Sequence, residues 1–272
     1  MSLTLRFHAK TSLPVEIEGV VPDRLQDKTL AEIERLPIGY GNRKLALAEL
    51  FSVSGDPSDG YIDLEGELAG VHWIGYGMKS GQIHVHGSAG RHVGGAMNGG
   101  RITVDGNAGD FAGCEMHGGL IHVAGSAGDL IGAAYPGSKK GMTDGTIYVG
   151  GDVGSEVGAS MRRGTLAVGG SCGDAVGFNM IAGSILVFGS CGARPGAAMR
   201  RGTIGLFGME TPKLLPTFRA AGRFRPLFLR LLFRELAHLG FPVDLGLLAS
   251  ELLLSHGDLV ALGKGEVWMR SD

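Results

Sequence analysis

The sequence lacks the features that identify several large classes of protein. Its 272 residues contain three cysteines, too few for a disulfide framework, and reduced thiols of this kind are expected in the cytoplasm. The first residues have no basic start followed by an apolar run, so we expect no signal peptide. No stretch of about eighteen apolar residues occurs, so we expect no membrane-spanning segment. The sequence therefore favours a cytoplasmic protein over a secreted adhesin or polysaccharide lyase.

Common catalytic and nucleotide-binding motifs are also missing. The formal net charge is −2, so the chain has no overall attraction to nucleic acid. It contains no G-x-G-x-x-G, no P-loop and no C-x-x-C. One G-x-S-x-G occurs at residues 169–173, but a nucleophile elbow needs a strand-to-helix turn, and this match arises from a repeat. We expect no catalytic residue in this chain.

Glycine is abundant, with 49 residues, and much of it belongs to a nineteen-residue repeat, G-x-I-x-V-x-G-x-x-G-x-x-x-G-x-x-M-x-x. A fixed period near twenty residues is typical of a solenoid, in which each unit buries its apolar face against its neighbours. The boundary glycines of the repeats, nineteen residues apart within each run, are Gly81, Gly100 and Gly119, and then Gly145, Gly164, Gly183 and Gly202.

Each repeat carries one short alternating segment, such as Ile83–Val85 or Ile102–Val104. Apolar residues at i and i+2 face one side of a strand, and nineteen residues with spaced glycines leave no room for a useful helix. We therefore predict an all-β solenoid. It would be a right-handed parallel β-helix of about seven to eight coils, with a mixed N-terminal cap and a helical C-terminal extension.

Two columns of the repeat predict core packing rather than chemistry. A methionine stands three residues before each boundary glycine, and a flexible thioether suits irregular core space better than a metal site. Cys172 and Cys191 share one repeat position with alanines and a valine elsewhere, which indicates small buried residues.

The two ends of the chain depart from the repeat and predict three domains: an α+β cap over residues 1–59, the β-helix over 60–208, and a basic helical extension over 209–272. A helix is expected over residues 27–36, with Asp27 as its N-cap. The amphipathic segment Leu227–Leu239 predicts a second helix. That helix could grip a partner subunit, lie on a membrane surface, or fold back as the C-terminal cap.

Two repeats are longer than the others, and insertions in solenoids often mark a functional face. The first spans 21 residues, from Gly60 to Gly81, and the fourth spans 26, from Gly119 to Gly145. The fourth-repeat insertion must leave the stack as a loop. With the basic C-terminal segment, it supplies our candidates for a partner interface: Tyr135, Lys139, Lys140, Arg223, Arg230 and Arg234.

Paired arginines predict a basic edge on the late repeats. Arg162-Arg163 and Arg200-Arg201 hold the same repeat position, and arginine suits carboxylate or phosphate partners. Their ordinary interpretation is a solvated edge.

The histidines do not predict a metal site in this chain. His84 and His86 share a face, but His122 lies two repeats from His84, about 10 Å away, too far for one ion.

Several segments carry a resemblance to a known family. The G-x-x-G-x-x-x-G repeats resemble the β-helix domain at the C-terminus of the glutamate synthase large subunit. They are more similar to the C subunits of formylmethanofuran dehydrogenase and of the bacterial formyltransferase/hydrolase complex. Residues 50–56, 74–78, 99–110 and 141–142 carry this likeness, and the region around residues 14–16 and 22–23 also looks like these C subunits. The likeness covers about residues 10–208.

The resemblance implies a non-catalytic scaffold subunit of a cytoplasmic hetero-oligomer in one-carbon metabolism. Its partners would be an amidohydrolase-like subunit, a molybdopterin-type subunit and a formyltransferase subunit. The metals and a methanofuran-type carrier are expected in those partners, and no cofactor is expected on this chain alone. The arginine-rich, lysine-poor composition favours the bacterial hydrolase version. The C subunit of an archaeal-type dehydrogenase, a glutamate-synthase-like binding module, and an enzyme acting through surface histidines are the alternatives.

Overall fold

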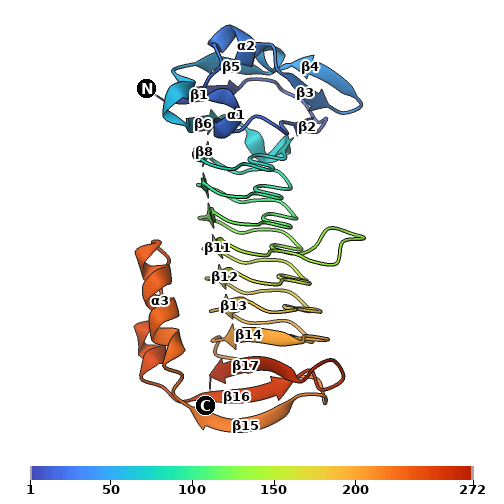
Figure 1. Cartoon of the computed structure of the whole chain (residues 1–272), viewed down its shortest axis with the longest axis vertical. Coiled ribbons are helices and arrows are strands. Elements are labelled where there is room, and N and C mark those ends of the chain that lie inside the picture. The colour runs from blue at the N-terminus through green and yellow to red at the C-terminus, as the bar shows by residue number, and fades with distance from the viewer. Residues whose placement is uncertain (1, 271–272) are drawn as a thin grey trace.

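The chain folds into a mostly β structure built on one long sheet. The computed structural model describes residues 2–270. It contains a sheet of 13 strands, a second sheet of four strands and few helices. Figure 1 shows the long sheet stacked along the longest axis of the molecule, with the N-terminal and C-terminal segments at opposite ends. The predicted fold class is confirmed as far as a mostly β chain with a long, largely parallel sheet.

Seven strands of the long sheet come from consecutive repeats, one strand from each. They are β8 (Gln82–His86), β9 (Arg101–Val104), β10 (Leu120–Val123), β11 (Thr146–Val149), β12 (Thr165–Val168), β13 (Ser184–Val187) and β14 (Arg201–Leu206). Each pairs in parallel with the next, and Ile102 aligns with Ile83 on one side and Ile121 on the other. Alternate residues face inward, and Ile102 and Val104 are fully buried. The predicted strand in each repeat is confirmed.

A second ladder of parallel β-bridges also joins successive repeats. It consists of isolated bridges that join Ala108, Ala127, Val153, Cys172 and Cys191 in order. The side chains along this ladder are small and lie at matching positions of successive repeats. The sequence predicts both cysteines to be small buried residues. The prediction is confirmed for Cys172, which is buried, and only in part for Cys191, which is partly buried.

Each repeated methionine from Met78 to Met180 packs against the boundary glycine of the following repeat. All seven, from Met78 to Met199, are fully buried, which confirms the prediction of a core column. Gly119 has φ +94°, and a Cβ added there would lie 2.7 Å from the Met97 methyl carbon and 2.7 Å from the Gly100 carbonyl oxygen. Glycine is therefore required at this corner both by its backbone angle and by the close approach of its neighbours.

The N-terminal segment extends the long sheet and adds a small second one. In the long sheet, β6 (Tyr61–Glu65) pairs in parallel with β8 and with β1 (Leu3–Phe7), and β1 pairs antiparallel with β5 (Phe51–Ser54). The second sheet contains β4 (Arg43–Ala46), β3 (Pro37–Tyr40), β2 (Val15–Glu16) and β7 (Val71–His72). Short turns of 3₁₀-helix cover Leu47–Glu49, Pro57–Asp59 and Leu68–Gly70.

The predicted N-terminal helix is shorter than expected and begins later. Two short helices occur, α1 (Pro22–Leu25) and α2 (Leu30–Glu34). The prediction of Asp27 as N-cap is wrong, because Thr29 caps α2 and forms a capping box with Glu32. A capping box needs a Glu or Gln three residues after the cap, and Asp27 is followed at that position by Leu30.

The C-terminal segment is only partly helical. The prediction of a helical extension is wrong for the three parts of this segment that form strands. These are β15 (Arg219–Phe224), β16 (Leu252–Gly257) and β17 (Lys264–Arg270). β17 pairs in parallel with β14, and β16 and β15 then follow in antiparallel order. These strands cover the open edge that the last repeat would otherwise expose. A short 3₁₀ turn, Leu245–Leu248, precedes β16.

The predicted second helix forms as α3 (Phe228–His238) and packs along the side of the long sheet. Its buried residues Leu229, Phe233 and Leu236 belong to one hydrophobic cluster with outward residues of the late repeats, among them Tyr148 and Leu186. The Tyr148 hydroxyl donates to the Leu239 carbonyl oxygen at 2.6 Å. The helix therefore folds back on its own chain, and its apolar side is used inside the molecule. None of the helices within residues 2–270 combines the length and apolar character needed to cross a membrane.

The glycine corner generates a stability prediction with a matched control. Gly119→Ala should lower the free energy of unfolding more than Gly137→Ala. Gly137 has a similar φ of +89°, but no atom lies within 4 Å of an added Cβ. Gly137→Ala adds only backbone strain of about 1–2 kcal/mol. Gly119→Ala adds steric overlap worth roughly 1–3 kcal/mol more. Urea unfolding of the purified chain measures both, and equal losses would contradict the packing argument.

Candidate functional site

The paired arginines lie together at one corner of the late repeats. The Arg162 amide donates to the Met142 carbonyl oxygen and the Arg200 amide to the Met180 carbonyl oxygen, each at 2.8 Å. The two pairs therefore hold the same corner two repeats apart, and all their side chains are exposed. We define the basic edge as Lys139, Lys140, Arg162, Arg163, Arg200 and Arg201.

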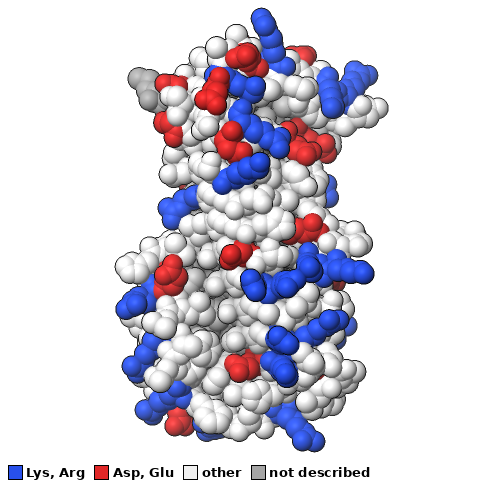
Figure 2. Space-filling model, in the orientation of Figure 1, with Lys and Arg blue, Asp and Glu red and all other residues white. Residues whose placement is uncertain are grey.

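Two adjoining surface hollows lie along the basic edge. The larger is about 500 Å³ and contains all four arginines and Lys140 in its lining. The second, about 370 Å³, is lined by both lysines, Arg200, Ser138, Ser160, Asn179 and Ile181. Figure 2 shows Lys and Arg side chains gathered beside the loop that projects from the stack in Figure 1. Among the described residues, no aspartate or glutamate lines either hollow, so positive charge is unopposed there.

The fourth-repeat insertion delivers the two lysines to the basic edge. Tyr135, at the base of this loop, packs near His92 and Phe111, with ring centroids 5.7 and 6.0 Å away. Its hydroxyl lies 3.3 Å from His92 Nδ1, and its amide donates to Glu115 Oε1 at 3.2 Å. Burial raises the pKa of the Tyr135 phenol far above its ordinary value, so it stays protonated. The ring is thus used to anchor the loop, while its role as a partner contact stays a prediction.

The chemistry of the basic edge suits the binding of anionic groups. Within residues 2–270, none of its six cations forms an ion pair with an acidic side chain. Arginine forks bind carboxylates and phosphates through paired hydrogen bonds. An extended partner with several anionic groups is the ligand that this surface suits.

The remaining predicted interface residues lie elsewhere. Arg223 is on β15, and Arg230 and Arg234 are on α3, all with exposed side chains. None of these three residues lines the hollows of the basic edge.

The structure brings together a second cluster that sequence reasoning missed. Asp63 on β6 lies beside His84 and His86 on β8, and one ligand atom from each lies within 4.8 Å of the others. His122, which the sequence places in the same repeat position as His84, instead stacks on Tyr148 with ring centroids 4.2 Å apart. The first repeat is two residues longer than the regular nineteen-residue repeat, and this spacing of 21 aligns Asp63 with His84. That spacing was the signal that could have found the cluster.

A comparison with solved structures matches nearly the whole chain. A chain in the crystal structure of the formyltransferase/hydrolase complex from Methylorubrum extorquens, in complex with methylofuran, is 36% identical with a TM-score of 0.91. The match covers 99% of this chain and 100% of that chain. Such identity over the full length extends the likeness beyond the repeat. No family model matches the sequence.

Curated relatives match over a shorter region. The C subunit of a molybdenum-containing formylmethanofuran dehydrogenase 1 of Methanothermobacter thermautotrophicus is 39% identical over 83 residues, which is 30% of this chain and 21% of that protein. The C subunit of a tungsten-containing formylmethanofuran dehydrogenase 2 of Methanothermobacter marburgensis is 37% identical over 86 residues, 30% of this chain and 32% of that protein. The matches therefore span about a fifth to a third of the length of these relatives.

The basic edge generates a binding prediction for the isolated chain. The double variant Arg162→Gln/Arg200→Gln should bind a fluorescent oligoglutamate peptide about 2- to 30-fold more weakly, because each exposed ion pair contributes roughly 0.2–1 kcal/mol. Fluorescence anisotropy at low and high salt measures the affinity. Arg230→Gln/Arg234→Gln removes the same charge from α3 and should leave binding nearly unchanged. Equal weakening by the two double variants would mean that only net charge matters.

Proposed function

The chain belongs to the family of C subunits of formylmethanofuran dehydrogenase and of the formyltransferase/hydrolase complex, and on that premise we propose that it is a non-catalytic scaffold subunit. The complex would be a cytoplasmic formyltransferase/hydrolase that converts formyl-tetrahydromethanopterin to formate through a formylmethanofuran-type carrier. This reaction would serve formaldehyde oxidation in one-carbon metabolism. The observation that carries the proposal is the full-length match, at 36% identity, to a chain of such a complex.

The shape and surface of the chain support a scaffold role. Strands that pair in register over the repeats make a long, well-packed body, with buried Ile, Val and Met columns along its length. Such a body holds surfaces at fixed separations without a moving part. The basic edge suits binding, because arginine and lysine side chains predominate in the lining of its hollows.

We further propose that the repeats form a right-handed parallel β-helix of about seven to eight coils over residues 60–208, with residues 1–59 and 209–272 as separate terminal domains. Two parallel ladders support this proposal: the strands of successive repeats form one, and bridges between matching positions of five consecutive repeats form the other. The coverage of both sheet ends by non-repeating strands also supports it.

The partner subunits would be amidohydrolase-like, molybdopterin-subunit-like and formyltransferase chains, which would hold the metals. The outer side of α3 is the surface that best fits such a partner. Leu227, at the helix start, is 72% exposed and Leu231 is 65% exposed, while Arg230 and Arg234 are exposed beside them. Apolar residues flanked by arginine are typical of protein interfaces.

The alternatives receive less support. The C subunit of an archaeal-type dehydrogenase would share this family, but the curated archaeal relatives match at most about a third of this chain. A glutamate-synthase-like module would account for the repeat, yet the full-length match includes the non-repeating ends.

The assembly proposal can be tested by native purification. The chain should co-elute with formyltransferase and amidohydrolase-like subunits, and Arg223→Glu/Arg230→Glu/Arg234→Glu should reduce the recovered complex because it reverses charge at the exposed face. Quantitative mass spectrometry of the eluate measures subunit ratios. A chain that elutes alone and active, or with a large glutaminase-containing partner, would overturn the proposal.

The basic edge would bind the acidic glutamate tail of the carrier. In the intact complex, Arg162→Glu/Arg163→Glu/Arg200→Glu/Arg201→Glu should raise the apparent KM for the carrier, because four reversed charges repel carboxylates. Steady-state kinetics with purified carrier measure this effect. The variant complex must first be verified as intact by its subunit ratios. An unchanged KM in an intact complex would remove the basic edge from the carrier path.

A further inference from the structure

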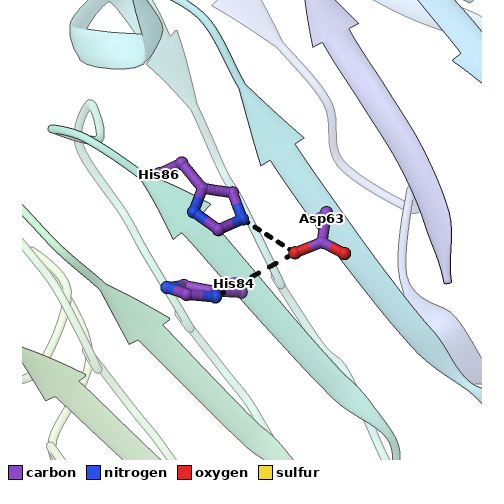
Figure 3. Close-up of side chains that lie close together, drawn as sticks. All are labelled: Asp63, His84 and His86. Carbon is purple, nitrogen blue, oxygen red and sulfur yellow. Dashed lines mark hydrogen bonds and ion pairs between the residues drawn. The ribbon is translucent and has the colours of Figure 1, made fainter.

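Two histidines and two aspartates form an isolated polar cluster on the outer face of the long sheet, where the first repeats begin. β6 and β8 pair in parallel so that Asp63 aligns with His84, and His86 follows on the same face. Figure 3 shows both imidazole rings turned toward the Asp63 carboxylate. The fourth member, Asp105, directly follows β9. This cluster lies on earlier strands than the basic edge and has no part in the function proposed above.

The ligand atoms of the cluster converge. Asp63 Oδ1 lies 2.8 Å from His86 Nε2 and 4.0 Å from His84 Nδ1. A tetrahedral zinc ion with nitrogen and oxygen ligands at about 2.0–2.2 Å separates neighbouring ligand atoms by roughly 3.3 Å. One observed separation is shorter than this value and the other is longer. Side-chain shifts of less than about 1 Å would therefore admit an ion.

The outer nitrogens of both imidazoles face a second carboxylate. Asp105 Oδ1 lies 2.8 Å from His84 Nε2, and Asp105 Oδ2 lies 3.4 Å from His86 Nδ1. An imidazole that donates its N–H to Asp105 presents the lone pair of its other nitrogen toward Asp63. A carboxylate behind a histidine is the arrangement that orients metal-binding imidazoles and makes them more basic.

The carboxylate ligand is oriented as well. The Ser2 hydroxyl donates to Asp63 Oδ2 at 2.6 Å, which leaves Oδ1 directed at the histidines. The remaining polar atom of each ligand side chain thus faces another side chain: Ser2 for Asp63, and Asp105 for both histidines.

The cluster is accessible, and its charge favours a cation. The side chains of Asp63, His84 and His86 are 19%, 26% and 40% exposed, so an ion can enter and keep a water ligand. With neutral imidazoles, Asp63 and Asp105 leave two negative charges that a divalent ion would neutralise. The Tyr61 hydroxyl also approaches His84 Nδ1, but at 3.5 Å this contact is weak and readily exchanged for an ion.

We propose that Asp63, His84 and His86 bind one divalent transition-metal ion of the zinc class, with Asp105 and Ser2 orienting the ligands. Two imidazoles and one carboxylate are suited to zinc, whereas magnesium and calcium prefer sets of oxygen ligands. The ion would join β6 to β8. Since Ser2 precedes β1, it would also strengthen the junction between the N-terminal segment and the repeats.

Isothermal titration of the tag-free full chain, first treated with EDTA, tests this proposal. ZnCl₂ should bind with a stoichiometry of one and a Kd in the micromolar range or below, while MgCl₂ should not compete. His86→Gln and Asp63→Asn should weaken zinc binding at least about 100-fold, because each removes a direct ligand. Asp105→Asn should weaken it about 10- to 100-fold, as expected for a group that orients ligands.

His122→Gln is the matched control, since His122 holds the same repeat position as His84 two repeats later. It should bind zinc like the unsubstituted chain. Circular dichroism verifies that each variant is folded. CoCl₂ gives a second measurement, because a tetrahedral site produces an intense visible absorption band and surface-bound cobalt does not. Absence of zinc binding, or equal binding by the His86→Gln and His122→Gln variants, would overturn the proposal.

Discussion

Backbone hydrogen bonds between successive repeats hold the long sheet together. The Arg101 amide donates to the Gly81 carbonyl oxygen at 3.0 Å, and the Thr146 amide donates to the Gly119 carbonyl oxygen at the same distance. The second bond crosses the enlarged fourth repeat, so the insertion leaves the register unchanged and emerges as a loop. Because the register never shifts, any residue type that recurs every nineteen positions becomes a continuous column along the molecule.

The outward column of these strands explains where the molecule is polar and where it is covered. At the early repeats it contains Asp63 and His84, and the polar cluster of two histidines and two aspartates forms there. From β11 onward it contains Tyr148, Ala167 and Leu186, all buried under α3 and the segment that follows it. Apolar residues at outward positions would be costly in water, so the helix folds back over this part of the sheet. The same outward column is therefore polar at the early repeats and apolar, under α3, at the late repeats.

Sequence reasoning succeeded where contacts repeat at a fixed spacing and failed where they do not. The Ile-x-Val strands, the methionine column and the helix near residues 228–238 were all predictable, since each has a local periodic signal. Strand β17 was missed because its partner, β14, lies more than sixty positions earlier, as in the pairing of Arg201 with Lys264. The N-cap was misplaced because Asp27 and Thr29 are both acceptable caps, and only Thr29 has Glu32 three residues later.

The sequence by itself determined the repeat, the inward and outward faces of its strands, and the shared corner of Arg162-Arg163 and Arg200-Arg201. These features follow from a constant period, because residues nineteen positions apart occupy equivalent places in successive repeats. Only the tertiary structure decided that Asp63 faces His84 and His86, that Lys139 and Lys140 join the arginines, and that α3 lies on its own sheet. Those arrangements depend on an irregular first repeat, a loop anchored through Tyr135, and a C-terminal segment that turns back. None of these follows the nineteen-residue period, so the packing of the whole chain decides which side chains meet.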